Sequence, residues 1–349
     1  MLITGHTGFK GGWLTLFLSR LGARVHGYGL DPPTTPSLFE VARVGTSLSS
    51  DTRADLADLA QLKSTFSQTL PEVVFHLAAQ SLVRTSYADP LGTLTSNVLG
   101  TAHVLEATRG CETVRALVLI TTDKVYENRE WLYPYREVDP LGGHDLYSAS
   151  KAAAELVAAS YRASFFSGNT GHRARVATAR AGNVIGGGDW ATDRLVPDCV
   201  RAFVSKVPAR LRLPAAVRPW QHVLDPLSGY MQLAEQLLIQ TDTSLDHAWN
   251  FGPDVSGDAT VGEVAATLAR LWGHAARVEY IPPIDQPHEA CLLRLDSTQA
   301  RMILGWRPRW PLPKALAQTA AWYHAWDQGF DMRAFTLDQI HAYTAAEPI

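Results

Sequence analysis

Apolar runs alternate with amphipathic stretches over the first half of the chain. Short apolar runs at residues 1–4, 24–29, 73–76, 116–120 and 174–179 have the length and composition of buried strands. Between them, residues 12–21, 57–69, 92–108 and 147–165 carry apolar positions at helical spacing. This alternation is typical of βαβ units and predicts an α/β fold with a doubly wound parallel sheet.

The pattern changes after about residue 182. Loops rich in Gly, Pro, Trp and Arg follow, and helical patterns recur near 195–205, 227–240, 261–271 and 312–326. We therefore expect a dinucleotide-binding domain at 1–182 that carries the catalytic residues. Residues 183–349 are expected to form mainly a smaller C-terminal α/β lobe for the substrate, with some segments returning to the first domain. Almost nothing precedes the first predicted strand, so either this strand is short or the native start lies upstream of Met1.

Composition and charge argue against some classes of binding partner. The chain has 349 residues, and its net charge of -3 provides no general attraction to nucleic acid or to a membrane surface. No apolar run approaches the ~20 residues of a membrane helix, and a glycine motif at residue 5 argues against a signal peptide. Cys111, Cys199 and Cys291 are far apart and odd in number, which indicates neither a metal site nor a disulfide framework. A reducing cytoplasm is the expected location.

A glycine-rich turn, Gly-His-Thr-Gly-Phe-Lys-Gly at residues 5–11, follows the first predicted strand and opens a helix. Glycines allow a tight turn and a close approach of the backbone to a pyrophosphate, which then faces the helix N-terminus. This arrangement is typical of the Rossmann-type dinucleotide site. The candidate cofactor contacts in this turn are Gly5, Thr7, Gly8, Phe9, Lys10 and Gly11.

Asp31 lies twenty residues after Gly11, at the end of the second predicted strand. A carboxylate there accepts hydrogen bonds from an adenosine ribose and repels a 2′-phosphate, which predicts NAD as the cofactor. The alternative is that Asp31 caps a turn before Pro32. Further candidate cofactor contacts are Asp51, Thr52, Ala78, Ala79, Gln80 and Asn97, although the two alanines fit a packing role equally well.

Tyr147 and Lys151 form a Tyr-x-x-x-Lys pair within a predicted helix, where positions i and i+4 share a face. We expect the Lys151 ammonium to lower the pKa of the phenol, so that Tyr147 takes a proton from a sugar hydroxyl near neutral pH. Both residues are also expected to contact the cofactor. Thr122 ends the preceding strand. Such a pair is common by chance, but it is more specific after a glycine-rich βαβ start.

Four segments, at residues 5–11, 122–128, 180–190 and 218–223, together resemble the CDP-glucose 4,6-dehydratases, a family of extended short-chain dehydrogenases/reductases. The resemblance runs from residue 1 to about residue 345. It implies NAD-dependent conversion of CDP-D-glucose to CDP-4-keto-6-deoxy-D-glucose, an early step toward deoxysugars of bacterial surface polysaccharides such as O-antigen. It also implies tightly bound NAD and a homodimer, or a tetramer, in which subunits pair through a four-helix bundle.

The resemblance also assigns roles. Tyr147 takes the C4 hydroxyl proton while hydride passes to NAD, and Thr122 hydrogen-bonds the same oxygen. Asp123 and Lys124 stand where dehydratases place the acid/base pair that removes water across C5–C6 before hydride returns to C6. The related dTDP-glucose branch has Asp-Glu here, and a lysine must be neutral to accept a proton, so whether Lys124 is the C5 base stays open. The implied substrate contacts are Asn183, Arg194, Arg218 and His288, next to Glu289.

The helices predicted at 92–108 and 147–165 carry apolar stripes suited to the implied dimer, unless both stripes face the sheet; these residues are Val98, Ala102, Leu105, Leu156 and Ala159. Two other functions remain alternatives. A nucleotide-sugar 4-epimerase or 4-reductase needs Thr122, Tyr147 and Lys151 but no acid/base pair at 123–124. A non-catalytic NAD sensor or scaffold needs neither Tyr147 nor Lys151.

Overall fold

A computed structural model describes residues 1–349 except 168–171, 241–243, 255–256, 274–275, 282–289 and 349. Its centre is a seven-stranded sheet in the order β11-β6-β5-β4-β1-β2-β3, and all its strand pairs are parallel. The predicted doubly wound parallel sheet is thereby confirmed. The strands are β1 (Leu2–Thr4), β2 (His26–Gly29), β3 (Ser50–Arg53), β4 (Val73–His76), β5 (Ala116–Ile120), β6 (Arg175–Arg180) and β11 (Ala248–Asn250).

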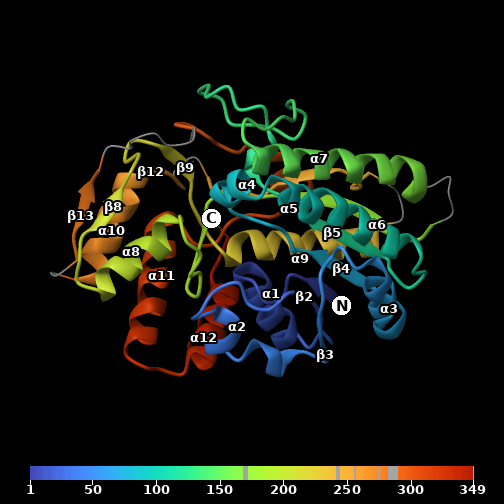
Figure 1. Cartoon of the computed structure of the whole chain (residues 1–349), viewed down its shortest axis with the longest axis horizontal. Coiled ribbons are helices and arrows are strands. Elements are labelled where there is room, and N and C mark those ends of the chain that lie inside the picture. Colours follow the sequence, from blue (N-terminus) through green and yellow to red (C-terminus); the bar gives the residue numbers. More distant parts are fainter. Residues whose placement is uncertain (168–171, 241–243, 255–256, 274–275, 282–289, 349) are drawn as a thin grey trace.

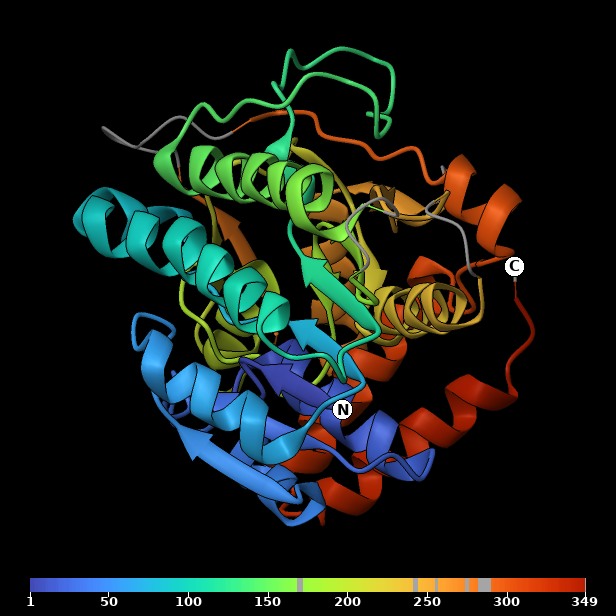
Figure 2. The same cartoon turned by 90° about the vertical axis from the view of Figure 1, so that its right-hand side faces the viewer.

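Successive strand residues point to opposite faces of the sheet, and helices cover both faces. Leu2, Val74 and Leu117 pack with α3 (Leu59–Thr69), α6 (Gly100–Arg109) and α7 (Leu146–Tyr161). Ile3 and Val118 face the other layer, which includes α1 (Phe9–Arg20) and α9 (Leu224–Ile239). Figures 1 and 2 show the sheet between these layers.

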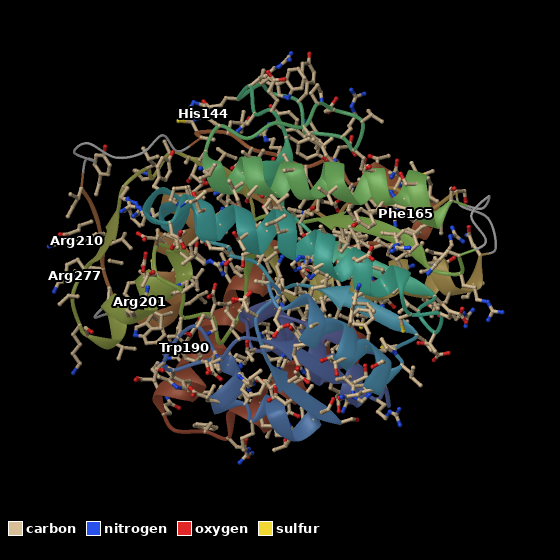
Figure 3. The ribbon with its side chains drawn as sticks, turned by 45° about the vertical axis from the view of Figure 1, so that its right-hand side comes forward. His144, Phe165, Trp190, Arg201, Arg210 and Arg277 are labelled. Atoms are coloured by element: carbon tan, nitrogen blue, oxygen red, sulfur yellow. The ribbon has the colours of Figure 1, made fainter. Side chains whose placement is uncertain are left out.

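The two long helices of the first half are interrupted. The helix predicted at 92–108 consists of α5 (Pro90–Leu94), a π-helical turn η2 (Thr95–Leu99) and α6, while α7 continues into a second π-helical turn, η4 (Arg162–Phe166). His144 and Phe165 mark the two ends of this α7 region in Figure 3. The shorter segments around the sheet are α2 (Leu38–Val41), η1 (Val44–Ser47), α4 (Val83–Ala88) and η3 (Asp123–Val125).

The second half forms a smaller lobe beside the carboxyl ends of the strands (Figure 1). Figure 3 shows Arg210 and Arg277 at its outer edge. Within the described residues, no helix has both the length and the apolar character needed to span a bilayer. Besides α9 and β11, which belong to the main sheet and its helical layer, the elements after β6 are β7 (Val184–Ile185), α8 (Leu195–Val204), β8 (Ala209–Leu211), β9 (Val217–Pro219), β10 (Gln221–His222), β12 (Asp258–Thr260), α10 (Val261–Trp272), β13 (Val278–Tyr280), η6 (Ala300–Leu304), α11 (Leu312–Asp327) and α12 (Met332–Ala345).

Candidate active site

A cavity of about 870 Å³ opens where the strand order reverses between β1 and β4, and residues of both halves of the chain line it. Open α/β sheets bind their ligands at such a switch point. The predicted site residues that line this cavity are Gly5, Thr7, Gly8, Phe9, Lys10, Gly11, Asp31, Ala78, Ala79, Gln80, Thr122, Asp123, Lys124, Tyr147, Lys151, Asn183, Arg194 and Arg218.

The glycine turn is packed so tightly that it admits no side chains at two positions. Gly5 has φ +75°, and a Cβ on it would lie 2.6 Å from the backbone nitrogen of Ala78. A Cβ on Gly11 would lie 2.1 Å from the carbonyl oxygen of Gly5. The turn therefore stays a backbone-lined cradle that leads into the N-terminus of α1, which fits the pyrophosphate of a dinucleotide.

Asp31 follows β2 at the cavity edge, and its side chain is 88% exposed; Arg53 Nη1 lies 3.2 Å from its Oδ1. The structure places Asp51 differently, because its carboxylate binds His6 Nε2 at 2.8 Å and Arg53 Nε at 2.8 Å. Neither Asp51 nor Thr52 lines the cavity. The lining residues in this region come after β3 has ended and are Ala54, Asp55 and Leu56.

Asn97 also lies behind the cavity wall. Its Nδ2 donates to Gln80 O at 3.0 Å and to Ser150 Oγ at 2.8 Å, and its Oδ1 accepts from Gln80 N at 2.9 Å. Asn97 therefore fastens the loop after β4 to helix α7. In the structure Asn97 holds the Gln80 backbone in place behind the cavity wall, whereas the sequence suggested direct contact with the cofactor.

Thr122 and Tyr147 are buried and face each other. Burial raises the pKa of the Tyr147 phenol to about 12, although its hydrogen bond with Thr122 and the charge of Arg194 act in the opposite direction. Lys151 Nζ donates to Ile120 O at 3.1 Å, and burial lowers its own pKa to about 8. For the Tyr147 phenol, the effect of burial on the pKa is therefore larger than the opposite effects of Thr122 and Arg194.

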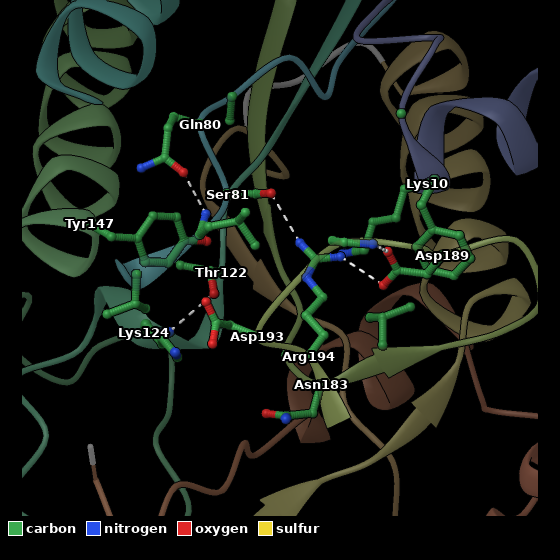
Figure 4. Close-up of a pocket in the computed structure, with 18 of the residues that line it drawn as sticks. Lys10, Gln80, Ser81, Thr122, Lys124, Tyr147, Asn183, Asp189, Asp193 and Arg194 are labelled. Carbon is green, nitrogen blue, oxygen red and sulfur yellow. Dashed lines mark hydrogen bonds and ion pairs between the residues drawn. The ribbon is translucent and has the colours of Figure 1, made fainter. Parts of the chain in front are cut away.

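Asp123 and Lys124 extend the site beyond the phenol. Thr122 Oγ1 donates to Asp123 Oδ1 at 2.9 Å, and Asp123 Oδ2 has no hydrogen-bond partner among the residues that the structure describes. Lys124 Nζ lies 6.0 Å from the centre of the Tyr147 ring. Figure 4 shows Thr122, Lys124 and Tyr147 on one side of the cavity. A phenol, a carboxylate and an amine thus surround one space.

The opposite side of the cavity is cationic. Arg194 Nη1 pairs with Asp189 Oδ2 at 2.9 Å, and its Nη2 donates to Ser81 Oγ at 2.9 Å (Figure 4). Burial, followed by the charge of Arg194, lowers the pKa of Lys10 to about 7. The sequence analysis missed Ser81 and Asp189. Ser81 directly follows Gln80, and Asp189 lies within the segment at 180–190, but a lone serine or aspartate carries no signal by itself.

The remaining predicted substrate residues lie farther along the cavity. Arg218 on β9 is buried, and its guanidinium donates to the carbonyl groups of Val217, at 3.0 Å, and Ala290. Asn183 adopts a left-handed conformation with φ +42°. His288 and Glu289 lie outside the described residues. Among the described residues there is also no cluster of His, Cys, Asp and Glu that would hold a metal ion.

Comparison with known proteins agrees with this site. The model of the GDP-mannose 4,6 dehydratase family matches residues 2–319. The chain belongs to this family of nucleotide-sugar 4,6-dehydratases. It is 45% identical to the CDP-glucose 4,6-dehydratase of Salmonella typhimurium, over 99% of this chain and 96% of the relative. It is 30% identical to the dTDP-glucose 4,6-dehydratase of Streptomyces griseus, over 72% and 71% of the two chains. The resemblance indicated by the motifs is confirmed.

Solved structures show the same fold at lower identity. A UDP-glucose 4-epimerase of Thermotoga maritima, solved with UDP-glucose, aligns with a TM-score of 0.80 and 21% identity over 93% of this chain and 98% of its own. A dTDP-glucose 4,6-dehydratase of Bacillus anthracis, solved in complex with NAD, aligns with a TM-score of 0.77 and 20% identity over 94% and 97%. At these identities the likeness establishes the fold alone.

Proposed function

We propose that this protein converts CDP-D-glucose to CDP-4-keto-6-deoxy-D-glucose with NAD as a cofactor that is regenerated in each cycle. One observation carries the proposal: Asp123 and Lys124 stand beside Thr122 and Tyr147 in one cavity. Oxidation at C4 requires only Thr122 and Tyr147 together with Lys151. Elimination of water needs an additional acid and an additional base. The relative that is 45% identical supports CDP as the nucleotide.

The residues present fit NAD, because Gly5 and Gly11 allow the turn to pack tightly on the neighbouring backbone, and this turn lines the cavity at the N-terminus of α1. When bound there, NAD supplies an acceptor for the C4 hydride and a donor of hydride to C6. Tyr147 accepts the C4 hydroxyl proton, and Thr122 orients that oxygen. Lys124 then removes the C5 proton, which the C4 ketone makes acidic, while Asp123 delivers a proton to the departing C6 hydroxyl. The proton held by Lys124 returns to C5 when C6 receives hydride.

Incubation with CDP-glucose, dTDP-glucose and UDP-glucose, followed by mass analysis, tests this function. We expect loss of one water from CDP-glucose with NAD present in far less than stoichiometric amount, because the hydride that leaves C4 returns to C6. A matched Tyr147→Phe variant serves as the control and should leave the sugar unchanged. Product limited to the amount of added NAD, or a product of unchanged mass, would contradict the proposal; the latter result would indicate an epimerase.

Preference for NAD over NADP belongs to the same proposal. The Asp31 carboxylate at the cavity edge repels a 2′-phosphate, while Arg53 beside it would attract one. We therefore predict that Asp31→Ser improves NADP binding relative to NAD by about tenfold or more, since one charge changes the balance of the local field. Titration of both cofactors by bound-cofactor fluorescence measures this ratio. An unchanged ratio would show that Asp31 merely ends the turn.

We also propose a homodimer formed by α5, α6 and α7. Leu91 on α5, Leu99 at the end of η2 and Leu156 on α7 are 75%, 53% and 61% exposed, so these neighbouring helical segments present leucines to solvent. The predicted stripe included Leu105, but that side chain is fully buried against the sheet.

The free thiols of the three cysteines support a reducing compartment such as the cytoplasm.

A further inference from the structure

A buried carboxylate lies directly behind the catalytic residues and has no part in the mechanism above. Glu155 is on α7, one helical turn after Lys151 and two turns after Tyr147, and it is only 2% exposed. An isolated carboxylate at such a depth is strongly unfavourable, so the protein must compensate for its charge. Four donors do so.

These donors come from both strands that end at the site. Glu155 Oε1 accepts from Thr121 Oγ1 at 2.6 Å and from Arg180 Nε at 2.9 Å. Its Oε2 accepts from Thr178 Oγ1 at 2.6 Å and from Arg180 Nη2 at 3.1 Å. One carboxylate therefore links α7 to the last residues of β5 and β6 by a bidentate pair with Arg180 and two short hydroxyl bonds.

The network continues to the segment that carries the acid/base pair. Arg180 Nη1 donates to Tyr126 Oη at 2.9 Å, and Tyr126 directly follows the short helix η3. Thr121 is the residue before Thr122, and its hydroxyl is committed to Glu155. This commitment explains why the two adjacent threonines differ: one anchors the strand end, and the other faces Tyr147.

Glu155 also acts on Lys151 through its charge. Burial lowers the pKa of Lys151, and Glu155 is the group that raises it. The Glu155 carboxylate itself stays ionised, because Arg180 and the two threonines lower its pKa against the effect of burial. The arrangement places a permanent negative charge behind the ammonium that shares a helix face with Tyr147.

We propose that Glu155 is a positioning residue for the C4 oxidation step: it holds Lys151 charged and keeps Thr122 and Tyr147 in register across α7, β5 and β6. This inference rests on the proposed function. Other titratable groups face Lys151 as well, namely Tyr147 on α7, His76 on β4 and Lys10 on α1. Asp123 on η3 acts on Tyr147. These groups are common to all the variants below, so their titrations cancel in the comparison.

The test is the pH profile of cofactor reduction in a single turnover of NAD-loaded enzyme with CDP-glucose. Glu155→Gln removes the charge and keeps the shape. We expect the alkaline limb to move down by about one pH unit, because Lys151 then loses its proton earlier. Near pH 8 the rate of NADH formation should fall about tenfold, while the KM for CDP-glucose changes less than about threefold.

Asp246→Asn is the matched control. Asp246, which lies shortly before β11, forms a second buried ion pair with Arg175 Nε at 2.8 Å. Arg175 is the first residue of β6, at the strand end remote from the site. We expect this variant to lose stability but to keep the wild-type pH profile. If Glu155→Gln folds and its profile superimposes on that of Asp246→Asn, the role of Glu155 is structural only and the inference is wrong.

A conservative variant keeps the test decisive if Glu155→Gln does not fold. Glu155→Asp retains the charge but is one methylene too short to reach both strand ends. We expect its alkaline limb within about half a pH unit of wild type and a rate lowered about threefold or more. An unchanged rate would overturn the positioning role. Wild-type enzyme that forms no NADH with CDP-glucose would instead overturn the proposed function, and with it this inference.

Discussion

Some side chains around Tyr147 are needed for the oxidation at C4, and others only for the later elimination of water across C5–C6. Lys124 Nζ lies over the phenol ring, 6.0 Å from its centre, but C4 oxidation does not require this amine. We predict that Lys124→Met still reduces the cofactor and then stalls, with a 4-keto sugar retained, because loss of a positioned base lowers its step about 10²–10⁴-fold. A single-turnover trace of bound NADH measures both events.

Two further variants help to interpret the NADH trace of Lys124→Met. Tyr147→Phe should leave the cofactor oxidised, since the first proton has no acceptor. Lys124→Glu should partly restore elimination, because a carboxylate occupies this position in the related dTDP-glucose branch. Turnover of Lys124→Met near the wild-type rate would show that another group removes the C5 proton. Failure before any NADH forms would place Lys124 in substrate binding instead.

Gly182 provides a test of Asp123 that moves the carboxylate without removing it. A Cβ on Gly182 would lie 1.8 Å from Asp123 Oδ2, so Gly182→Ala must displace the acid. We predict that the variant reduces cofactor but loses water about 10²-fold more slowly, since the acid would be out of position. Gly110→Ala is the control, because its Cβ would meet only carbonyl oxygens at 3.7 Å. Equal water loss by both variants would argue against Asp123 as the acid.

At the scale of elements, α9 and α12 meet through a buried carboxyl group. Asp225 Oδ1 accepts from Tyr343 Oη at 2.8 Å and from Arg309 N at 2.7 Å. Burial raises the pKa of Asp225 from 3.8 to about 6, so the folded chain keeps this proton to higher pH than the unfolded chain. The associated stability is fully present below pH 3.8 and is lost as the pH rises through about 6.

Asp225→Asn keeps both hydrogen bonds to Oδ1 and stays uncharged. The difference between the two pKa values corresponds to about 3 kcal/mol. We therefore predict that above pH 6 the variant melts about 4 °C higher than wild type, while near pH 4 the two melt alike. Calorimetry at several pH values measures this, with Asp338→Asn on the exposed face of α12 as control. A variant that melts lower at every pH would contradict the argument.

The elements also show what the sequence pattern can reveal. The apolar runs at Val73–His76 and Ala116–Ile120 are central strands with exactly these bounds, because both faces are buried and a continuous apolar run is diagnostic. Strand β3 alternates between partly buried and exposed residues and lies at the sheet edge. The apolar pattern therefore does not mark where β3 ends, and the cavity is lined by Ala54, Asp55 and Leu56 rather than by the predicted Asp51 and Thr52.

For the whole molecule, motifs identified the groups that approach a ligand directly. Glycines of the turn, the Tyr-x-x-x-Lys pair and the Thr-Asp-Lys run all line one cavity. Residues that support them are harder to recognise, because Glu155, Asp189 and Ser81 owe their position to contacts between distant segments. Asn97 shows the same limit, since it was predicted beside the cofactor and fastens Gln80 to α7 instead.

Leu99 at the end of η2 and Leu156 on α7 are exposed, and they lead to the last prediction, which concerns assembly. Burial of apolar surface contributes about 25 cal/mol per Å², so a helix pair that presents Leu99 and Leu156 to solvent gains stability when a second copy covers it. We predict a dimer in light scattering at micromolar concentration. Leu156→Glu should convert it to a monomer, because each two-fold interface would then contain two copies of a desolvated charge. Leu132→Glu is the control, since Leu132 is 76% exposed but lies on the loop before α7 rather than on these helices. If both variants are dimers, or if the wild-type protein is a monomer, Leu99 and Leu156 do not form a dimer interface.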